Sequence, residues 1–273
     1  ANPALGVFRS IEEFRQTATR AKEIPSLEAG FRRLYLNQWV NSDVAWMNMS
    51  KWHLCNDFIP ESELLGKECY CGIDLSATTD LTSVNLEFRL DDGRYVMLSH
   101  SFMPENRVLE KEKVDRVPYS VWIKQGYITA TPGDVIDYEF VKAYIRTAAI
   151  KFVIKEICFD PWNSTQLAND LENEGFVMVA VRQGFATLSE PTKDILALVY
   201  QKRIVHNQNP VLTWAISNCI TRQDPNGNIA LDKAKSKNRI DPAAAMVNSH
   251  SRARMLDTTI DLNKLILGDE FSF

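Results

Sequence analysis

The stretch Cys69-Tyr-Cys-Gly-Ile-Asp-Leu75 is mostly apolar and predicts a buried β-strand. The next segment, Thr82 to Arg89, alternates apolar and polar residues with the period of two that a strand requires. Asp91-Asp-Gly93 predicts a hairpin turn, because glycine tolerates the positive φ angles of such turns, and Arg94 to Ser101 then returns as a third strand. The core is therefore expected to open as an antiparallel meander.

Beyond the meander and a long connection, helices alternate with apolar strands. Helices are expected at 137–150, 164–173, 191–202 and 210–219, apolar strands at 152–159 and 176–181, a hairpin around Asn226-Gly227, and a last helix from Asp241-Pro242. Apolar strands separated by helices pair in parallel and are buried on both faces. The predicted fold class is thus α/β, with a mixed five-stranded sheet flanked by helices.

The 273 residues are expected to fall into a helical arm, a main domain and a tail. The arm covers 1–65, where the capping box Ser10-Ile-Glu-Glu13 begins a helix. The main domain covers 66–255 and the tail 256–273. The longest apolar runs have six residues (176–181 and 195–200), whereas a membrane span needs about 20, and the N-terminus does not resemble a signal peptide.

The five cysteines are odd in number and include no C-x-x-C pair, which favours free thiols in a reducing compartment. A zinc site formed by His53, Cys55, Cys69 and Cys71 is the weaker alternative, because a C-x-C pair on a strand is a poor match to the spacing of structural zinc ligands. Buried thiols that behave as small hydrophobic groups are the simpler prediction.

Three aspartates, Asp74, Asp160 and Asp241, each follow large apolar residues and are therefore attached to rigid elements. If the strands that carry Asp74 and Asp160 lie side by side in parallel, their carboxylates are neighbours, and like charges that close raise each other's pKa. Divalent cations remove this conflict, and carboxylate oxygens are the ligands that Mg²⁺ and Mn²⁺ prefer. Two such ions suit the hydrolysis of a phosphodiester.

Each aspartate also has a structural explanation when taken alone. Asp241 can be a helix N-cap and Asp160 can begin a turn at Asp160-Pro161. Asp74 lies within or at the end of a strand core, where an unpaired charge is costly, so a structural role is harder to assign to it. The three acids in this order of elements favour the metal site.

These motifs resemble the C-terminal nuclease domain of the large terminase subunits of tailed bacteriophages, which has an RNase H-like fold. The resemblance covers roughly 66–254 and rests on the segments 72–81, 158–163, 206–214 and 237–247. It implies a metal-dependent endonuclease that cleaves double-stranded DNA concatemers during genome packaging. It also implies that Asp74, Asp160 and Asp241 hold two Mg²⁺ or Mn²⁺ ions and act as the catalytic acids, with Asp80 as an additional acid near the metals.

The resemblance further implies double-stranded DNA, a portal protein and a small terminase subunit as partners, in the cytoplasm of the host cell. Full-length members carry an ATPase domain, but G-x-x-x-x-G-K-[ST] does not occur in this sequence. We therefore expect a fragment whose ATPase domain belongs to the same full-length polypeptide. A transposase or junction resolvase on the same fold, and a non-catalytic module that docks on DNA or portal, remain alternatives.

The net charge of −4 does not by itself favour a nucleic-acid partner, but the charges are unevenly distributed. Between residues 232 and 254 there are six basic and two acidic side chains. Such a stretch beside a metal site suits contacts to DNA phosphates, which position the duplex without reading its sequence. The predicted DNA-binding residues are Lys233, Lys235, Lys237, Arg239 and Arg252.

Overall fold

A computed structural model of the chain describes residue 6 and residues 10–23, 31–32, 34–36, 44–76, 80–162, 164–236 and 238–255. Its centre is a seven-stranded sheet in the order β5-β4-β3-β2-β6-β7, with β8 also paired to β4. Three strands form the predicted antiparallel meander: β2 (Glu68–Asp74), β3 (Thr82–Arg89) and β4 (Tyr95–Pro104). On the other side of β2, β6 (Val153–Phe159) and β7 (Met178–Ala180) continue the sheet in parallel.

The predicted mixed α/β fold is confirmed, and all five predicted strands lie in the sheet. The number of strands is seven rather than five, because β5 (Ile128–Thr131) and β8 (Ile204–Val205) both pair in parallel with β4. Strands of four and two residues are too short to show a period of two in the sequence. Both lie at the edge of the sheet, far from the acids in the strand order.

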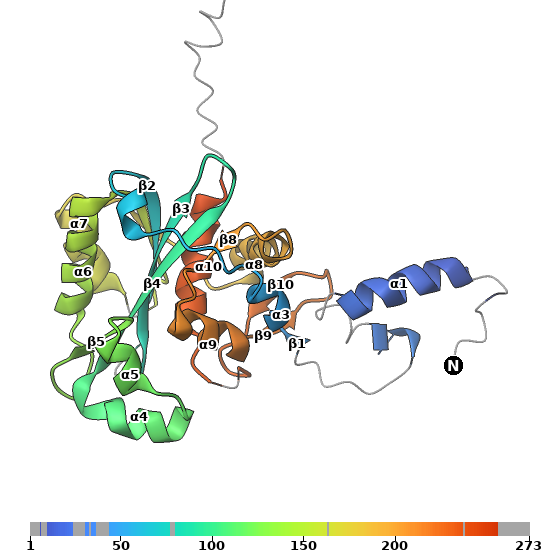
Figure 1. The fold of residues 1–273 in the computed structure, drawn as a ribbon, viewed down its shortest axis with the longest axis horizontal. Helices are drawn as coiled ribbons and strands as arrows, with labels where there is room; N and C mark the ends of the chain where they lie inside the picture. Colours follow the sequence, from blue (N-terminus) through green and yellow to red (C-terminus); the bar gives the residue numbers. More distant parts are fainter. Residues whose placement is uncertain are drawn as a thin grey trace, which may run out of the picture.

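Helices cover both faces of the sheet (Figure 1). One face carries α6 (Tyr138–Lys151) and α7 (Thr165–Asn173), and the other carries α8 (Phe185–Tyr200), α9 (Pro210–Asn218) and α10 (Asp241–Ala253). Each face has its own apolar core: Leu86 and Ile145 belong to the first, and Leu212 and Met246 to the second. The strands are thereby buried on both sides, as parallel pairing demands.

The helix expected at 191–202 begins six residues earlier, at Phe185, so that Pro191 lies inside it. Proline lacks an N–H and therefore cannot bond the carbonyl of Thr187, but this loss falls in the second turn of the helix and α8 continues through it. The long connection that follows β4 is also structured. It contains η2 (Glu105–Arg107), α4 (Val108–Asp115) and α5 (Tyr119–Lys124).

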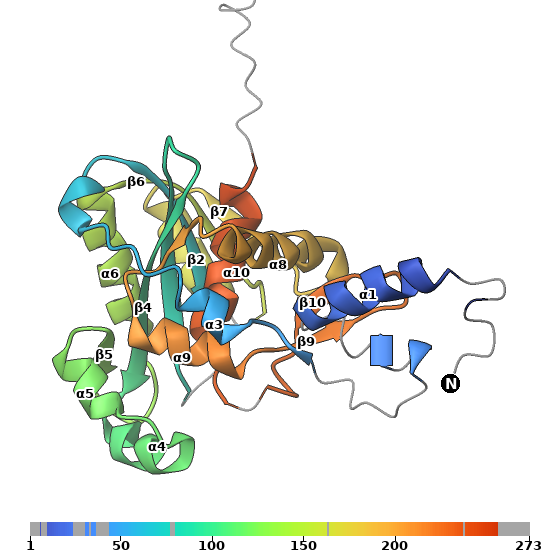
Figure 2. The same cartoon turned by 45° about the vertical axis from the view of Figure 1, so that its right-hand side comes forward.

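The N-terminal segment contributes α1 (Ile11–Glu23), β1 (Val44–Ala45), α3 (Met49–Trp52) and η1 (Glu61–Glu63). The predicted cap of α1 is present, since the Ser10 Oγ accepts a hydrogen bond from the Glu13 N–H at 3.3 Å. The predicted hairpin, β9 (Ile220–Gln223) and β10 (Ile229–Leu231), forms a small separate sheet with β1 (Figure 2). The domain boundaries stay a prediction, and the tail at 256–273 lies outside the described residues.

Two tryptophans tie residues 44–52 to the main body. The Trp46 indole donates to the Thr192 carbonyl at 3.3 Å, and the Trp52 indole donates to the Thr213 hydroxyl at 3.1 Å. Both rings are buried, at 1% and 0% exposure. In the described part of the chain, no helix has the length and apolar character to cross a membrane.

Helix α10 lies directly on β2 at Gly72. A Cβ atom built at Gly72 would lie 2.0 Å from the Ala245 carbonyl oxygen and 2.5 Å from the Ser249 nitrogen. Both of these atoms belong to the helix backbone, so a side chain at position 72 would force the helix away from the sheet. Only glycine permits this close approach.

The C-terminal half of α10 is held by a sealed polar network. His250, with 0% of its side chain exposed, lies between Glu87 on β3 (2.6 Å from Nδ1) and Asp194 on α8 (3.1 Å from Nε2). Ser249 donates to the second Glu87 oxygen at 2.7 Å, and Asn85 donates to the Ser249 hydroxyl at 2.9 Å. Burial lowers the pKa of His250, but Glu87 and Asp194 outweigh it and raise the pKa to about 9.

The cysteines are all buried and free. Cys55 belongs to the core on the α10 side of the sheet, whereas Cys69 and Cys71 belong to the core on the α6 side. Burial raises the pKa of the Cys69 thiol to about 12, so this sulfur stays protonated and is a poor metal ligand. These surroundings fit the prediction of buried thiols.

Candidate active site

Two of the three predicted acids lie at the carboxyl ends of neighbouring strands. Asp74 is the last residue of β2, and Asp160 directly follows β6. The two strands are parallel, and Ile73 lies opposite Phe159, so the residues that follow them leave the same edge of the sheet together. The adjacency expected from the sequence is therefore present in the fold.

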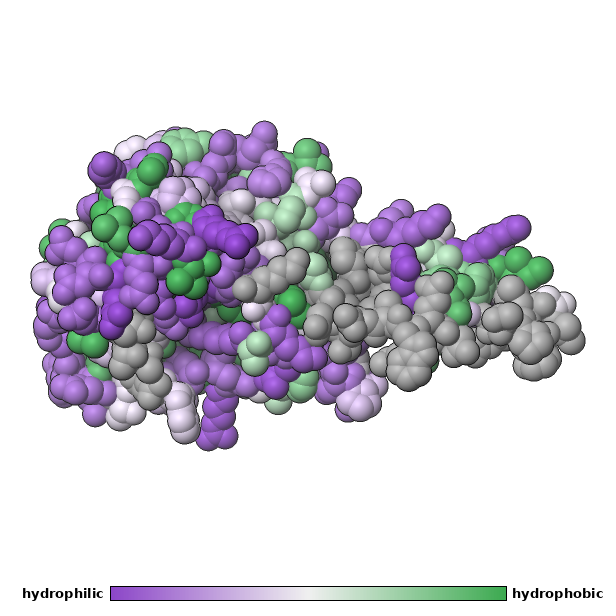
Figure 3. Space-filling model, turned by 90° about the horizontal axis from the view of Figure 1, so that it is seen from below, coloured by the Kyte–Doolittle hydropathy of each residue, from purple (hydrophilic) through white to green (hydrophobic). Residues whose placement is uncertain are grey.

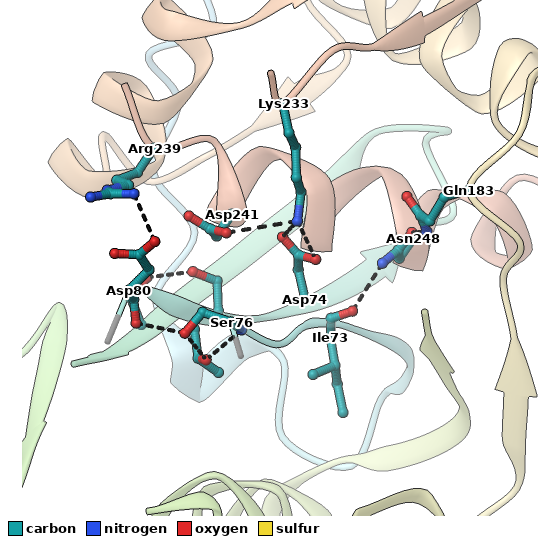
Figure 4. Close-up of polar contacts among 12 residues, drawn as sticks. Ile73, Asp74, Ser76, Asp80, Gln183, Lys233, Arg239, Asp241 and Asn248 are labelled. Carbon is teal, nitrogen blue, oxygen red and sulfur yellow. Dashed lines mark hydrogen bonds and ion pairs between the residues drawn. The ribbon is translucent and has the colours of Figure 1, made fainter. Parts of the chain in front are cut away.

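Asp241 comes to this place on the first turn of α10. It is not the N-cap, because it is itself the first helical residue and Ile240 holds the N-cap position. Its side chain is only 12% exposed. Burial, followed by the charge of Asp74, raises the pKa of Asp241 to about 7. The simple N-cap explanation of Asp241 is thus wrong, and its carboxylate faces Asp74 instead (Figure 4).

A lysine lies between these two acids. Lys233 belongs to the turn that follows β10, and its Nζ donates to both Asp74 oxygens at 2.7 and 2.6 Å. The same Nζ is 3.8 Å from the Asp241 Oδ1. Burial lowers the pKa of Lys233, but the charges of Asp74 and Asp241 outweigh it and the pKa is raised. The sequence predicted Lys233 to contact DNA, and nothing in the sequence indicated that it reaches the acids.

A chain of amides fixes the tip of β2 against α10. Asn248 donates from its side chain to the Ile73 carbonyl at 2.9 Å, and Gln183 donates to the Asn248 Oδ1 at 3.3 Å (Figure 4). The bonded carbonyl belongs to the residue before Asp74, so these amides position the carboxylate. Sequence reasoning missed both residues, because their partners are far away in the chain.

Asp160 lies at the edge of a pocket of about 300 Å³ between α8, β10 and α10. The Asp160 Oδ1 accepts a hydrogen bond from the Trp162 N–H at 3.0 Å, and burial raises the pKa of this carboxyl, with a further contribution from Asp74. Lys233, Gln183 and Asn248 also line the pocket. Of the three acids, Asp160 is therefore the one that lines the pocket, and Lys233 lies between the pocket and the other two.

Asp80 is held apart from the other acids by cations. Lys111 donates to one of its oxygens at 2.7 Å and Arg239 to the other at 2.8 Å. Arg239 also lies 3.6 Å from Asp115. Figure 4 shows the Asp80 carboxylate turned toward Arg239 and away from Lys233. The role of Asp80 as a metal ligand stays a prediction.

The other predicted DNA-binding residues are spread along the chain. Lys235 is exposed in the same turn as Lys233, and Lys237 lies outside the described residues. Arg252 forms a bidentate pair with Glu156 (2.5 and 2.8 Å), about 16 Å from Asp241 along the helix. The face seen in Figure 3 is largely hydrophilic, with hydrophobic residues scattered among the coloured side chains.

The donor atoms suit a hard divalent cation, although the arrangement is not a finished metal site. Among the residues that the structure describes, no three His, Cys, Asp or Glu side chains converge as a metal-binding group. Asp74 and Asp241 share a single positive charge, the Lys233 ammonium. The pKa of Asp241 is raised all the same, so this one charge does not fully offset the burial of the two carboxylates. Carboxylate oxygens are the ligands that Mg²⁺ and Mn²⁺ prefer, so the donor chemistry of Asp74 and Asp241 suits such an ion.

Comparisons with known proteins give a consistent result. The family model described as "Terminase large subunit, endonuclease domain" matches residues 1–257. The large terminase subunit of Enterobacteria phage HK97 is 35% identical over 251 residues, which is 91% of this chain and 49% of that protein. Protein YmfN of Escherichia coli K12 is 28% identical over 268 residues, 94% of this chain and 59% of YmfN.

A solved structure agrees with the sequence comparisons. The crystal structure of the HK97 bacteriophage large terminase superimposes with a TM-score of 0.72 at 35% identity, over 92% of this chain and 52% of that one. The chain spans about half the length of these relatives.

Proposed function

This chain belongs to the family of terminase large-subunit endonuclease domains, as its motifs suggested, and from this premise we propose that it is a metal-dependent endonuclease that cuts double-stranded DNA. The observation that carries the proposal is the meeting of two buried carboxylates, Asp74 and Asp241, on a single cation beside Asp160. A buried acid cluster of this kind is costly for the fold and is characteristic of functional sites.

In the proposed mechanism, Asp74, Asp160 and Asp241 hold two Mg²⁺ or Mn²⁺ ions. Such ions, when bound, supply an activated water and neutralise the charge that develops on the leaving oxygen. The chain's own part is to hold the three carboxylates on rigid elements: the tips of β2 and β6, and the first turn of α10. Asn248, bonded to the Ile73 carbonyl, keeps β2 and α10 in register.

We further propose that the duplex is gripped through its phosphates by Lys233, Lys235, Lys237, Arg239 and Arg252. The natural substrate would be a concatemer of viral genomes, cut during packaging in the cytoplasm of the host cell. The partners would be a portal protein, a small terminase subunit and the ATPase domain of the same polypeptide. Membership of the family supports the proposed substrate and partners, and the basic stretch at 232–254 supports the proposed phosphate contacts.

The test is cleavage of supercoiled and linear duplex DNA in Mg²⁺ or Mn²⁺. Asp74→Asn is expected to abolish cleavage, because it removes the carboxylate whose charge acts on both other acids. Asp91→Asn is the matched control, since it makes the same chemical change in the exposed turn between β3 and β4. A folded protein that cuts no DNA with either metal, or an Asp74→Asn variant that cuts normally, would contradict the proposal. Strand transfer, or a strong preference for four-way junctions, would indicate a transposase or resolvase.

A further inference from the structure

The ammonium of Lys233 occupies the oxygens that a metal would need. It bonds both oxygens of Asp74, whose side chain is 5% exposed, while 51% of the Lys233 side chain is open to solvent. The lysine therefore extends from a partly exposed position into the acid cluster, where Figure 4 shows its nitrogen at Asp74. A divalent cation that binds Asp74 would lie beside the positive charge of this ammonium, so the lysine and the metal compete for the same carboxylate.

The turn that carries Lys233 is built independently of this contact. Asp232 caps it: its Oδ1 accepts from the Ala234 and Lys235 N–H groups at 3.1 and 3.2 Å, and its carbonyl accepts from the Ser236 hydroxyl at 2.7 Å. Strand β10, which precedes the turn, is held by its ladder of hydrogen bonds with β9. Withdrawal of the Lys233 side chain therefore needs only rotation about its own bonds, because the backbone of the turn keeps its hydrogen bonds.

We propose that Lys233 is a tethered counter-ion which competes with the metal for Asp74 and moves to a DNA phosphate when the duplex binds. The inference rests on the proposed function. Among the described residues, the ion pairs of Lys233 are with Asp74 and Asp241, so without DNA the lysine remains on these acids and metal affinity is low. A phosphate offers it an alternative anion, which frees Asp74. Binding of metal and binding of DNA then strengthen each other by the same factor, because linkage is reciprocal.

The test is calorimetric titration of Ca²⁺ into the protein with and without a short duplex, followed by electrophoresis to verify that the duplex stays intact. Wild type is expected to bind Ca²⁺ at least about fivefold more tightly when DNA is present, a typical coupling between two sites. Lys233→Met is expected to bind Ca²⁺ about tenfold more tightly than wild type without DNA, and to gain little from the duplex. Lys233→Arg, which keeps the charge, should retain the competition.

Two controls make the outcome decisive. Lys193→Met removes a lysine from the exposed surface of α8 and should titrate as wild type does; Asp74→Asn should lose the site. If wild type and Lys233→Met bind Ca²⁺ equally without DNA while Asp74→Asn does not bind, the competition is disproved and the metal site survives. If wild type and Lys233→Met both fail to bind, with and without DNA, the counter-ion role falls together with the proposed function. Thermal unfolding of each variant verifies that it is folded.

Discussion

The two ends of α10 bury charge in opposite ways. At its start, Asp241 faces Asp74 across a lysine whose side chain is half exposed. Nine residues later, the fully buried His250 lies between Glu87, which is fully buried as well, and Asp194, whose side chain is 37% exposed. The first cluster has two buried acids and a cation that can leave. The second has a cation built into the core, with its partners on two other elements.

This difference distinguishes a functional site, at the start of α10, from a structural contact, at its end. A sealed pair that loses one partner leaves an uncompensated charge in the core, which is strongly destabilising. An acid cluster closed by a solvent-facing lysine can exchange that cation for another without disturbing the fold. The end of α10 at His250 therefore fixes the helix on the sheet. The end at Asp241 keeps two buried like charges together, which costs stability and leaves the carboxylates available for chemistry.

The contrast between the two ends of α10 would be wrong if Asp241 served the fold rather than the chemistry. We expect Asp241→Asn to reduce DNA cleavage on the order of 10³-fold, because charge stabilisation by metals amounts to several kcal/mol. The free energy of unfolding should rise at neutral pH, because the raised pKa of Asp241 means that its ionised carboxylate opposes folding, and the amide removes that charge. Cleavage assays and denaturant titration measure the two quantities. A loss of stability above about 3 kcal/mol would mean that the acids hold the fold together.

The cluster around His250 should dominate the pH dependence of the free energy of unfolding. The pKa of His250 is raised to about 9 from a usual value of about 6.5, so its stabilising contribution is complete below pH 6.5 and disappears as the pH rises through 9. Over this interval the wild type should lose on the order of 3 kcal/mol in its free energy of unfolding. The pKa of Asp194 is lowered, so this residue acts only at acid pH. Denaturant titrations between pH 6 and 9.5 measure the loss.

His250→Gln is the control for this interval. The variant should be less stable at pH 6.5 and should show a flatter dependence on pH. Equal slopes in wild type and variant would show that another group causes the loss.

The smallest expected effect concerns the middle of α10. Gly72→Ala should cost about 2 kcal/mol, because its methyl group meets the helix backbone, and overpacking of this kind typically costs 1–3 kcal/mol. Cleavage should fall as well, since the displaced helix carries Asp241. Gly184→Ala is the control for packing: nothing lies within 4 Å of a Cβ built there, and the expected loss is only the cost of alanine at the N-cap of α8, on the order of 0.5–1 kcal/mol. If Gly72→Ala is as stable and active as wild type, the helix accommodates the shift and its two ends are not rigidly linked.

Most of the sheet could be predicted from the sequence because its central strands are long and apolar. The carboxyl ends of β2 and β6 followed from the same patterns, and with them the adjacency of Asp74 and Asp160. The alternation in β3 was visible too, but its polar face gave no sign that Asn85 and Glu87 lie buried beneath α10. That depends on His250 and Ser249, which come more than 160 residues later.

The contacts that shape the site were beyond sequence reasoning for the same reason. Lys233 meets Asp74 across 159 positions, and Asn248 meets Ile73 across 175. A basic run beside an acid suggests phosphate binding equally well whether its lysines point outward or into the acids. Only the path of the hairpin decides this.

The small sheet joins two distant parts of the chain by a mechanical path. Strand β1 pairs with β9 through Val44 and Ala45, β9 pairs with β10, and Lys233 follows β10 after a single intervening residue. Tension applied to the chain before Val44 would therefore pass through two short ladders of hydrogen bonds to the turn that positions the lysine. Trp46 is bonded to α8, so it would transmit part of that tension to the body of the protein and leave the rest to the hairpin.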